Sequence, residues 1–300
     1  TGVLNGDKHA FKNVVLNGSG LFAYVQDDAV IRDLKLSHPV MQLGEVVTSA
    51  GLLANTIQGN MSGDDGSMET ETVAATLHNI HIESPKVVGD GYKGLFGGLV
   101  GEASLFVGVT QSSVTEADIT LPMAESIIGG LAGKLATSSS VKACLFTGTI
   151  NGGDAVGGIV AEAGSGEAIQ HCHVDATLHG TNTIGGVIAY SQRAPIANCY
   201  VEGNLVLSDK ARVGKVGGVI GNLEVDEMGN GPIVLANCLI GIESITLPID
   251  SVYAHRVIGF SAGDKYNYFE QKYEMPETKI QGCYILSDLA AVDASIQLTD

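Results

Sequence analysis

The feature that most constrains this chain is a short unit that recurs along most of its length. In the clearest copy, the pair Gly157-Gly158 is followed by an apolar run and then by a strand-like segment around Cys172. The closest copies, marked by Gly130, Gly158 and Gly186, are 28 residues apart, so the longer intervals are this unit with insertions. Taking the second residue of each small-residue pair as a register mark gives Gly20, Gly51, Gly98, Gly130, Gly158, Gly186, Gly218 and Gly259.

The segment after each mark has a pattern in which every cysteine of the protein occupies the fourth position. Because side chains alternate across a strand, Cys172 and Val174 would point one way while His171 and His173 point the other. In the third copy the alternation changes phase after Val114, which predicts a β-bulge. The residues in the fourth position are Leu34, Ile80, Ser112, Cys144, Cys172, Cys199, Cys238 and Cys283.

Repeats that contain short strands and no helical period must stack on their neighbours to bury an apolar face. We therefore predict an all-β fold, a right-handed parallel β-helix solenoid of about eight to nine coils, with successive coils ~4.8 Å apart. The 40 glycines and the absence of tryptophan agree with many short strands and tight corners. In this fold the cysteines form an internal ladder of small, soft side chains.

A single β-helix domain is expected to cover residues 1–300. The chain begins at Thr1 in what reads as the middle of a repeat, so we expect a fragment of a longer exported protein. Residues 1–16 would add a further coil or half-coil. At the other end, Ser287 or Asp288 would cap a short helix that covers the last open strand edge.

Three insertions interrupt the coils, at residues 55–71, 222–232 and 263–278. Insertions in a solenoid map to loops on its outside, and loops carry function more often than the frame does. The first contains Asp64 and Asp65 in an acidic, Gly-rich segment. Oxygen ligands of this kind suit Ca²⁺, although the spacing is not that of an EF-hand, and a solvated loop explains the same residues.

The third insertion is rich in aromatic residues. Exposed aromatic side chains provide contact area for glycans or proteins, so these residues form a candidate binding site. They would also pack against their own coil, and the lack of tryptophan weakens the glycan interpretation. The candidate residues are Tyr266, Tyr268, Phe269 and Tyr273.

The cysteines and histidines offer other chemistry. Five cysteines without a Cys-x-x-Cys pair are expected to be free, buried thiols. The alternative is a disulfide between neighbours in the ladder, such as Cys144 and Cys172. His171 and His173 would project outward together, where two imidazoles can hold a transition metal. Two solvated histidines on an outer sheet face are the simpler interpretation.

The charge of the chain excludes some classes of partner. A formal net charge of −17 argues against nucleic-acid binding, which needs a basic surface, and against docking on anionic membranes. No apolar run approaches the ~18 residues that span a bilayer, so membrane insertion is not expected. A polysaccharide-cleaving enzyme would need carboxylates grouped with a base, Arg or Lys on one outer face. The sequence shows scattered acids instead, without a recurrent cluster on adjacent coils.

Four segments that contain register marks share one pattern. They are Gly20-Leu21-Phe22-Ala23, Gly98-Leu99-Val100-Gly101, Gly130-Leu131-Ala132-Gly133 and, with Val for Leu, Gly218-Val219-Ile220-Gly221. These segments resemble the GLUG motif. The resemblance covers most of the chain and extends to repeats in large surface proteins and adhesins of gut bacteria. The chain is also similar to the region before the catalytic domain of IgA-protease-type metallopeptidases.

This resemblance implies a right-handed β-helix in an exported or surface-attached bacterial protein, used as a stalk or an adhesive surface. It implies no catalytic residue. The zinc-peptidase signature His-Glu-x-x-His is absent from the sequence, so peptidase activity would belong to another part of a longer chain.

These observations lead to one main hypothesis and two alternatives. We expect a non-catalytic extracellular or cell-surface β-helix without a cofactor, acting as an adhesin, stalk or binding scaffold for host glycan, host protein or neighbouring domains. The alternatives are a carbohydrate-active enzyme (a polysaccharide lyase or hydrolase) and the non-catalytic region of a surface metallopeptidase. Charged residues from three neighbouring coils in one groove would favour the enzyme. A flat outer face with scattered charge would favour the scaffold.

Overall fold

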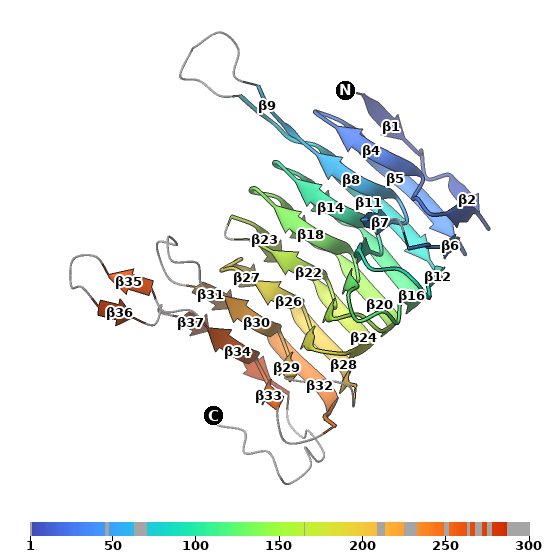
Figure 1. Ribbon diagram of the computed structural model, residues 1–300. Coiled ribbons are helices and arrows are strands. Elements are labelled where there is room, and N and C mark those ends of the chain that lie inside the picture. The colour runs from blue at the N-terminus through green and yellow to red at the C-terminus, as the bar shows by residue number, and fades with distance from the viewer. Residues whose placement is uncertain are drawn as a thin grey trace.

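The chain folds into a parallel β-helix in which short strands stack in register from one coil to the next (Figure 1), as the repeat predicts. Within the part of the chain that the computed structural model describes, there are strands, turns and no helix. Those residues accordingly include no helix that is long and apolar enough to cross a membrane. The described residues are 2–45, 48–62, 71–164, 166–208, 214–224, 233–248, 252–262, 265–267, 272–274 and 278–286.

Each full coil contributes to three parallel sheets. In the coil that begins with β21 (Ala155–Gly157), the chain passes into β22 (Val160–Ala163) of a second sheet and then into β23 (Ala168–Gln170) and β24 (His173–Gly180) of a third. A bend at His171 separates β23 from β24. The core lies between the three sheets and is filled by the inward-facing apolar side chains of every coil.

The seven-stranded sheet contains β7 (Ser49–Gly51), β13 (Leu95–Gly97), β17 (Ile127–Gly129), β21, β25 (Thr183–Gly185), β29 (Gly214–Gly217) and β33 (Val252–His255). The eight-stranded sheet contains β4 (Phe22–Gln26), β8 (Ala54–Gln58), β14 (Val100–Ser104), β18 (Ala132–Ala136), β22, β26 (Ile188–Ser191), β30 (Ile220–Glu224) and β34 (Ile258–Ala262). The 19-stranded sheet contains β1 (Val3–Asn5), β2 (Ala10–Lys12), β3 (Val15–Asn17), β5 (Val30–Ser37), β6 (Val40–Gln42), β11 (Thr76–Glu83), β12 (Lys86–Val88), β15 (Gly108–Thr110), β16 (Ser113–Thr120), β19 (Ser140–Lys142), β20 (Leu145–Asn151), β23, β24, β27 (Ile196–Ala197), β28 (Tyr200–Leu207), β31 (Ile233–Ala236), β32 (Leu239–Thr246), β37 (Thr278–Gln281) and β38 (Tyr284–Ile285).

The glycine pairs form the corner between the seven-stranded and eight-stranded sheets. A Cβ atom on Gly157 would lie 1.9 Å from the backbone oxygen of Val160, and one on Gly158 would lie 2.1 Å from that of Gly186 in the next coil. No side chain is tolerated at such distances, so glycine is required here for close backbone approach.

Strand pairing corrects two of the register marks. Gly51 pairs with Gly97, the first glycine of its pair, so this mark is one residue early. In the last coil Gly217 pairs with His255, so the mark falls directly after His255 and not at Gly259. Small residues recur at several places in each coil, and residue type alone therefore left the register ambiguous.

The cysteine ladder is confirmed. Backbone hydrogen bonds connect each ladder residue to the coil above it, for example from the amide of His173 to the oxygen of Cys144 and from that of Tyr200 to the oxygen of Cys172, both at 2.9 Å. All five cysteines are free thiols, four of them buried, while Cys283 in the last coil is half-buried.

The residues that directly precede the ladder positions form a second column, and the chain bends at each of them. Its backbone is left-handed in every coil, with φ of 54° at His171, for example. Asn and Asp tolerate this conformation better than most residues, and their side chains connect coils: Asn79 Nδ2 donates to Asp33 Oδ1 at 2.6 Å, and Asn237 Nδ2 donates to Asn198 Oδ1 at 3.2 Å. The column consists of Asp33, Asn79, Gln111, Ala143, His171, Asn198, Asn237 and Gly282.

The predicted irregularity after Val114 is a β-bulge, because the register between β16 and β20 shifts between Val114 and Ala117. The predicted half-coil at the start of the chain is also present, since β1 and β2 pair in parallel with β5, and β3 pairs with β6. The predicted helix after Ser287 lies outside the described residues.

The strands shift the boundaries of the three insertions. Asn55 belongs to β8, Asn222 to β30 and Thr278 to β37, all regular strands of the coils. The first insertion contains the antiparallel hairpin of β9 (Asn60–Ser62) and β10 (Glu71–Val73), and the third contains that of β35 (Lys265–Asn267) and β36 (Lys272–Glu274). Both hairpins extend from the same side of the helix in Figure 1.

The ladder predicts opposite effects for two neighbouring residues. Cys172→Asp buries a carboxylate without a partner and is expected to lower the free energy of unfolding by about 3–5 kcal/mol. His171→Asp changes an exposed residue whose left-handed backbone Asp tolerates, so a change within about 0.5 kcal/mol is expected. Urea denaturation measures both, and equal effects would show that the inward and outward assignments are wrong.

The corner predicts a similar contrast between two glycines. Gly157→Ala places a methyl group against backbone atoms and is expected to destabilise the protein by about 2–3 kcal/mol. Gly108→Ala in β15 meets no atom within 4 Å, so its effect is expected to stay below about 0.5 kcal/mol. Thermal unfolding of the two variants, compared with the unmodified chain, tests whether close approach is the reason for the glycine.

Candidate functional site

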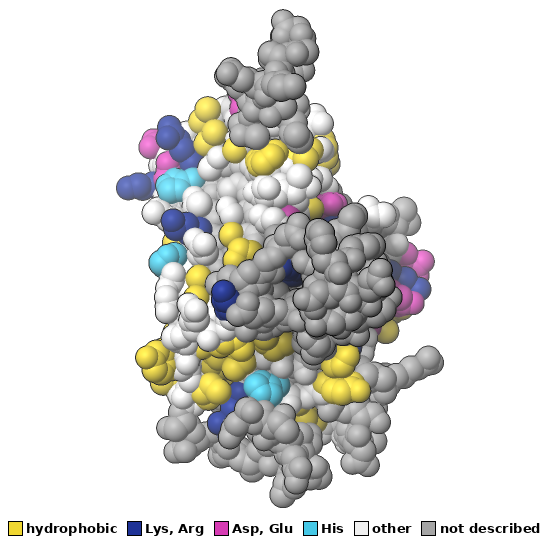
Figure 2. Space-filling view, turned by 90° about the vertical axis from the view of Figure 1, so that its left-hand side faces the viewer, with side chains coloured by type: hydrophobic (Ala, Val, Ile, Leu, Met, Phe, Trp, Pro, Cys, Tyr) yellow, Lys and Arg dark blue, Asp and Glu magenta, His cyan; other side chains and the backbone are white. Residues whose placement is uncertain are grey.

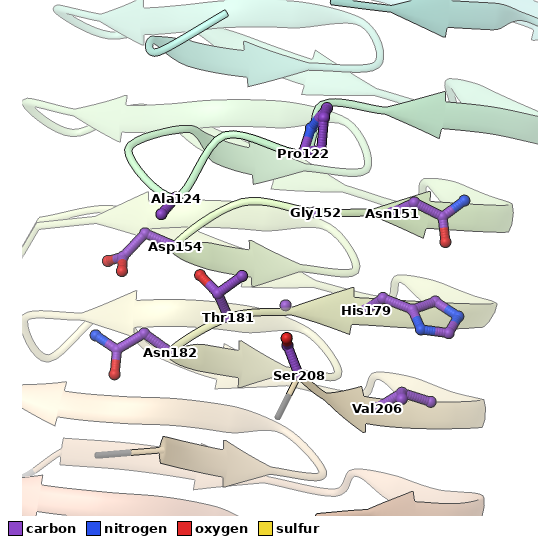
Figure 3. Close-up of a pocket in the computed structure, with 11 residues that line it drawn as sticks. Pro122, Ala124, Asn151, Gly152, Asp154, His179, Thr181, Asn182, Val206 and Ser208 are labelled. Atoms are coloured by element: carbon purple, nitrogen blue, oxygen red, sulfur yellow. The ribbon is translucent and has the colours of Figure 1, made fainter. Parts of the chain in front are cut away.

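Two recesses open on the outside of the helix, each with a volume of about 860 Å³. The corner recess lies where the 19-stranded sheet turns into the seven-stranded sheet (Figure 3). The sheet recess lies over the eight-stranded sheet and the loops that follow it. Asp154 lines both recesses, so they are neighbours.

Differences in corner length create the corner recess. Three residues separate β20 from β21 and two separate β24 from β25, whereas six separate β16 from β17 and six separate β28 from β29. The two short corners line the recess together with Pro122, Ala124 and Ser208 of the longer corners before and after them. The recess is therefore a consequence of two successive coils being shorter than their neighbours.

Polar groups of different kinds line the corner recess (Figure 3). Asn151 and His179 are register partners on adjacent coils, and Asp154 and Asn182 come from the two short corners. Burial raises the pKa of Asp154, while hydrogen bonds from Asn182 and Tyr190 act in the opposite direction. Burial also lowers the pKa of His179, so its imidazole is neutral at neutral pH and offers one donor and one acceptor.

A column of polar side chains crosses the sheet recess. Strand pairing places Lys134, Glu162 and Tyr190 one above another on β18, β22 and β26. Glu102 precedes them on β14 and Asn222 follows on β30. These residues alternate with buried apolar ones and therefore leave the sheet on its outer side.

The charges in this column are not balanced. Burial raises the pKa of Glu162, the nearby Lys134 lowers it, and the carboxylates of Glu224 and Glu102 raise it further. One ammonium group therefore lies among several carboxylates, of which those of Glu102 and Glu162 are partly withdrawn from water. Such an arrangement favours a ligand that brings positive charge or hydrogen-bond donors.

Tyr190 connects the two recesses. Thr183 Oγ1 donates a hydrogen bond to the Tyr190 hydroxyl at 3.0 Å, and this hydroxyl in turn donates to Asp154 Oδ2 at 3.5 Å. Burial is the main cause that raises the pKa of Tyr190. The hydroxyl is therefore protonated at neutral pH, and its proton is directed to Asp154.

Asn222 is the polar residue of the column whose hydrogen bonding is incomplete. Its side chain is fully buried, its Nδ2 donates to Glu224 Oε1 at 2.9 Å, and its Oδ1 has no hydrogen-bond partner. A buried acceptor without a donor is costly. This one lies beside the sheet recess, whose lining includes its neighbour Glu224.

Glu167, which also lines the sheet recess, has a structural role. It is 2% exposed, and its carboxylate accepts hydrogen bonds from the backbone amides of Ser138, at 3.2 Å, and Gly166, at 2.9 Å. Ser138 belongs to the preceding coil, so the bond connects the loops of two coils. Its acceptor capacity is largely used within the protein.

Two aromatic candidates of the third insertion belong to the hairpin of β35 and β36. Tyr266 on β35 pairs directly with Tyr273 on β36 in the hairpin, while Tyr268 and Phe269 lie outside the described residues. Exposed hydrophobic side chains occur near both ends of the stack (Figure 2). Tyr284 in β38, with 69% of its surface exposed, is one of them.

The two histidines that were candidate metal ligands have different partners. His173 Nε2 lies 2.9 Å from Glu202 Oε1, and its ring stacks on Tyr200 with a centroid distance of 4.8 Å. His171 lies at the bend and approaches Asn198 instead. No group of three His, Cys, Asp or Glu residues in the described ranges is arranged to hold a metal ion. Asp64 and Asp65 fall outside those ranges, so the Ca²⁺ prediction stays a prediction.

Sequence reasoning missed the column of the sheet recess and expected scattered charge. A signal was present, because Glu102, Lys134, Glu162, Tyr190 and Asn222 each follow the second glycine of their unit by four positions. These polar residues interrupt otherwise apolar runs. The cysteine positions, in contrast, fall on the 19-stranded sheet. The structure shows instead a grouping of charged residues on three adjacent coils.

The pKa of Glu162 predicts a pH-dependent contribution to stability. Its folded-state pKa is raised above the ordinary 4.5, so the folded state retains the proton to higher pH and the free energy of unfolding falls as pH rises between the two values. Glu162→Gln removes this penalty. The variant is expected to have a higher Tm than the unmodified chain at pH 7 and the same Tm below pH 4.

The exposed Glu243 on β32 provides the control, since Glu243→Gln makes the same change of charge away from the recess. Calorimetry at the two pH values measures all three proteins. If Glu162→Gln and Glu243→Gln have the same Tm at pH 7, the carboxylate of Glu162 does not destabilise the folded state.

Comparisons with known proteins do not narrow the possibilities. No family model matches the chain, and no curated protein matches its sequence.

Proposed function

We propose that this chain is a β-helix binding scaffold of an exported bacterial protein, which binds glycans outside the cell and does not cleave them. The observation that carries the proposal is the pair of adjoining recesses, which expose carboxylate, amide and hydroxyl groups on a rigid frame. Glycans present many hydroxyl groups, and partly desolvated acceptors of this kind bind them with directional hydrogen bonds.

The frame supports this proposal. Residues in the recesses come from strands and short corners whose backbones are hydrogen-bonded on both sides, so little conformational entropy is lost when a ligand is bound. The GLUG resemblance adds the expectation of a surface adhesin or stalk. Host protein is the other partner that such a scaffold would bind, and the hairpin of β35 and β36 is the element we would assign to it.

A carbohydrate-active enzyme is the second candidate, and one observation favours it. Glu102, Lys134 and Glu162 come from three adjacent coils and line up on one outer face. A carboxyl group with a raised pKa, such as that of Glu162, serves as a general acid in glycoside cleavage. The third alternative, the non-catalytic region of a metallopeptidase, makes the same binding scaffold part of a longer enzyme.

A glycan array with the purified chain distinguishes these functions. The unmodified protein is expected to retain at least one class of glycan, and the double variant Asp154→Asn, Glu162→Gln is expected to lose about tenfold or more in affinity. Glu243→Gln serves as the control and is expected to bind normally. The bound glycans are then incubated with the protein and analysed for new reducing ends and unsaturated products.

Each outcome has a definite meaning. Binding without cleavage supports the scaffold. Cleavage that is lost in Glu162→Gln would replace the scaffold with the enzyme. Failure to retain any glycan would refute the proposed function and leave a stalk without a glycan site.

A further inference from the structure

We propose that the sheet recess selects glycans that carry free amino groups. The inference rests on the proposed glycan-binding function and adds to it the chemistry of the ligand. It is argued from the side chains that line the recess, their charges and one buried acceptor atom.

Carboxyl groups outnumber cations in the recess. Four carboxyl side chains line it, from Asp154, Glu162, Glu167 and Glu224, against the single ammonium of Lys134 among its described lining residues. Glu167 is bonded to backbone amides, whereas Glu162 lies among like charges on a partly desolvated surface. A ligand cation relieves this repulsion, and an acidic sugar such as a uronate increases it.

Two hydrogen-bond donors beside the recess are already engaged. The Tyr190 hydroxyl donates to Asp154, and Asn222 Nδ2 donates to Glu224. Beside the recess, the fully buried Oδ1 of Asn222 is an acceptor without a hydrogen-bond partner. Asn222 is the register partner of Tyr190 and leaves the sheet on the same outer side. A ligand group that only donates, such as an ammonium, therefore complements the recess better than one that must also accept.

The arrangement of the column favours a polymer. Glu162, Tyr190 and Asn222 occupy the same position in successive coils, which lie ~4.8 Å apart. A chain of amino sugars presents donors at regular intervals and can engage several coils at once. Simultaneous contacts of this kind strengthen binding more than a single contact does.

The test compares two oligosaccharides with the same backbone. Glucosamine hexamer carries free amines and N-acetylglucosamine hexamer does not. In titration calorimetry with the full chain, the amine form is expected to bind at least about tenfold more tightly. Glu162→Gln and Glu224→Gln are each expected to weaken binding of the amine form about fivefold or more and to change binding of the acetylated form little. Glu243→Gln should bind both as the unmodified protein does.

A gain-of-function variant separates a binding role from a structural one. Lys134→Met removes the cation that competes with the ligand amine, so it is expected to strengthen binding of the glucosamine hexamer about threefold or more. A Tm measurement of each variant confirms that it is folded. A purely structural column would give weaker or unchanged binding in this variant.

The outcomes separate the inference from the function on which it rests. Equal affinity for the two hexamers overturns the selection of amines but leaves glycan binding intact. Absence of binding to both, together with an empty glycan array, overturns the proposed function as well. Binding of hexalysine as tightly as the glucosamine hexamer would identify a site for basic peptides and refute the glycan assignment.

Discussion

The structure depends on in-register stacking of coils through backbone hydrogen bonds. Each strand of a coil pairs in parallel with the equivalent strand above and below, so one position in the repeat becomes a column that runs along the helix. The residue type at each position is then constrained by its neighbours in the column as much as by its own coil. Cys172 lies between Cys144 and Cys199, and a polar side chain there would disturb three coils.

The same constraint explains where recesses can form. The strands are held to a common length by their neighbours, and variation in coil length has to be taken up at corners and insertions. Between β16 and β29 the corner of the seven-stranded sheet is six, three, two and six residues long. A hollow over the short corners follows from this difference alone, without any change in the sheets. In such a fold, functional sites are positioned by short corners as well as by long insertions.

The sequence was sufficient for the fold because the inward columns are chemically restrictive. All five cysteines share one inward position, the glycine pairs meet backbone atoms, and the phase change after Val114 has one structural explanation. Outward columns are less restrictive, since solvent accepts many residue types there. The sequence therefore shows the pairing of Glu162 with Tyr190 only as a shared spacing from the second glycine of each unit. The unpaired Oδ1 of Asn222 depends on side-chain packing, which spacing does not encode.

The carboxylate of Asp154 has a consequence for the two recesses as a unit. It accepts hydrogen bonds from Asn182 on the side of the corner recess and from Tyr190 on the side of the sheet recess. A ligand in one recess that forms a hydrogen bond with this carboxyl group changes the hydrogen-bonding groups that remain available in the other recess. Thermodynamic linkage requires the effect to be reciprocal, so ligands in the two recesses would change each other's affinity through a single shared carboxyl group.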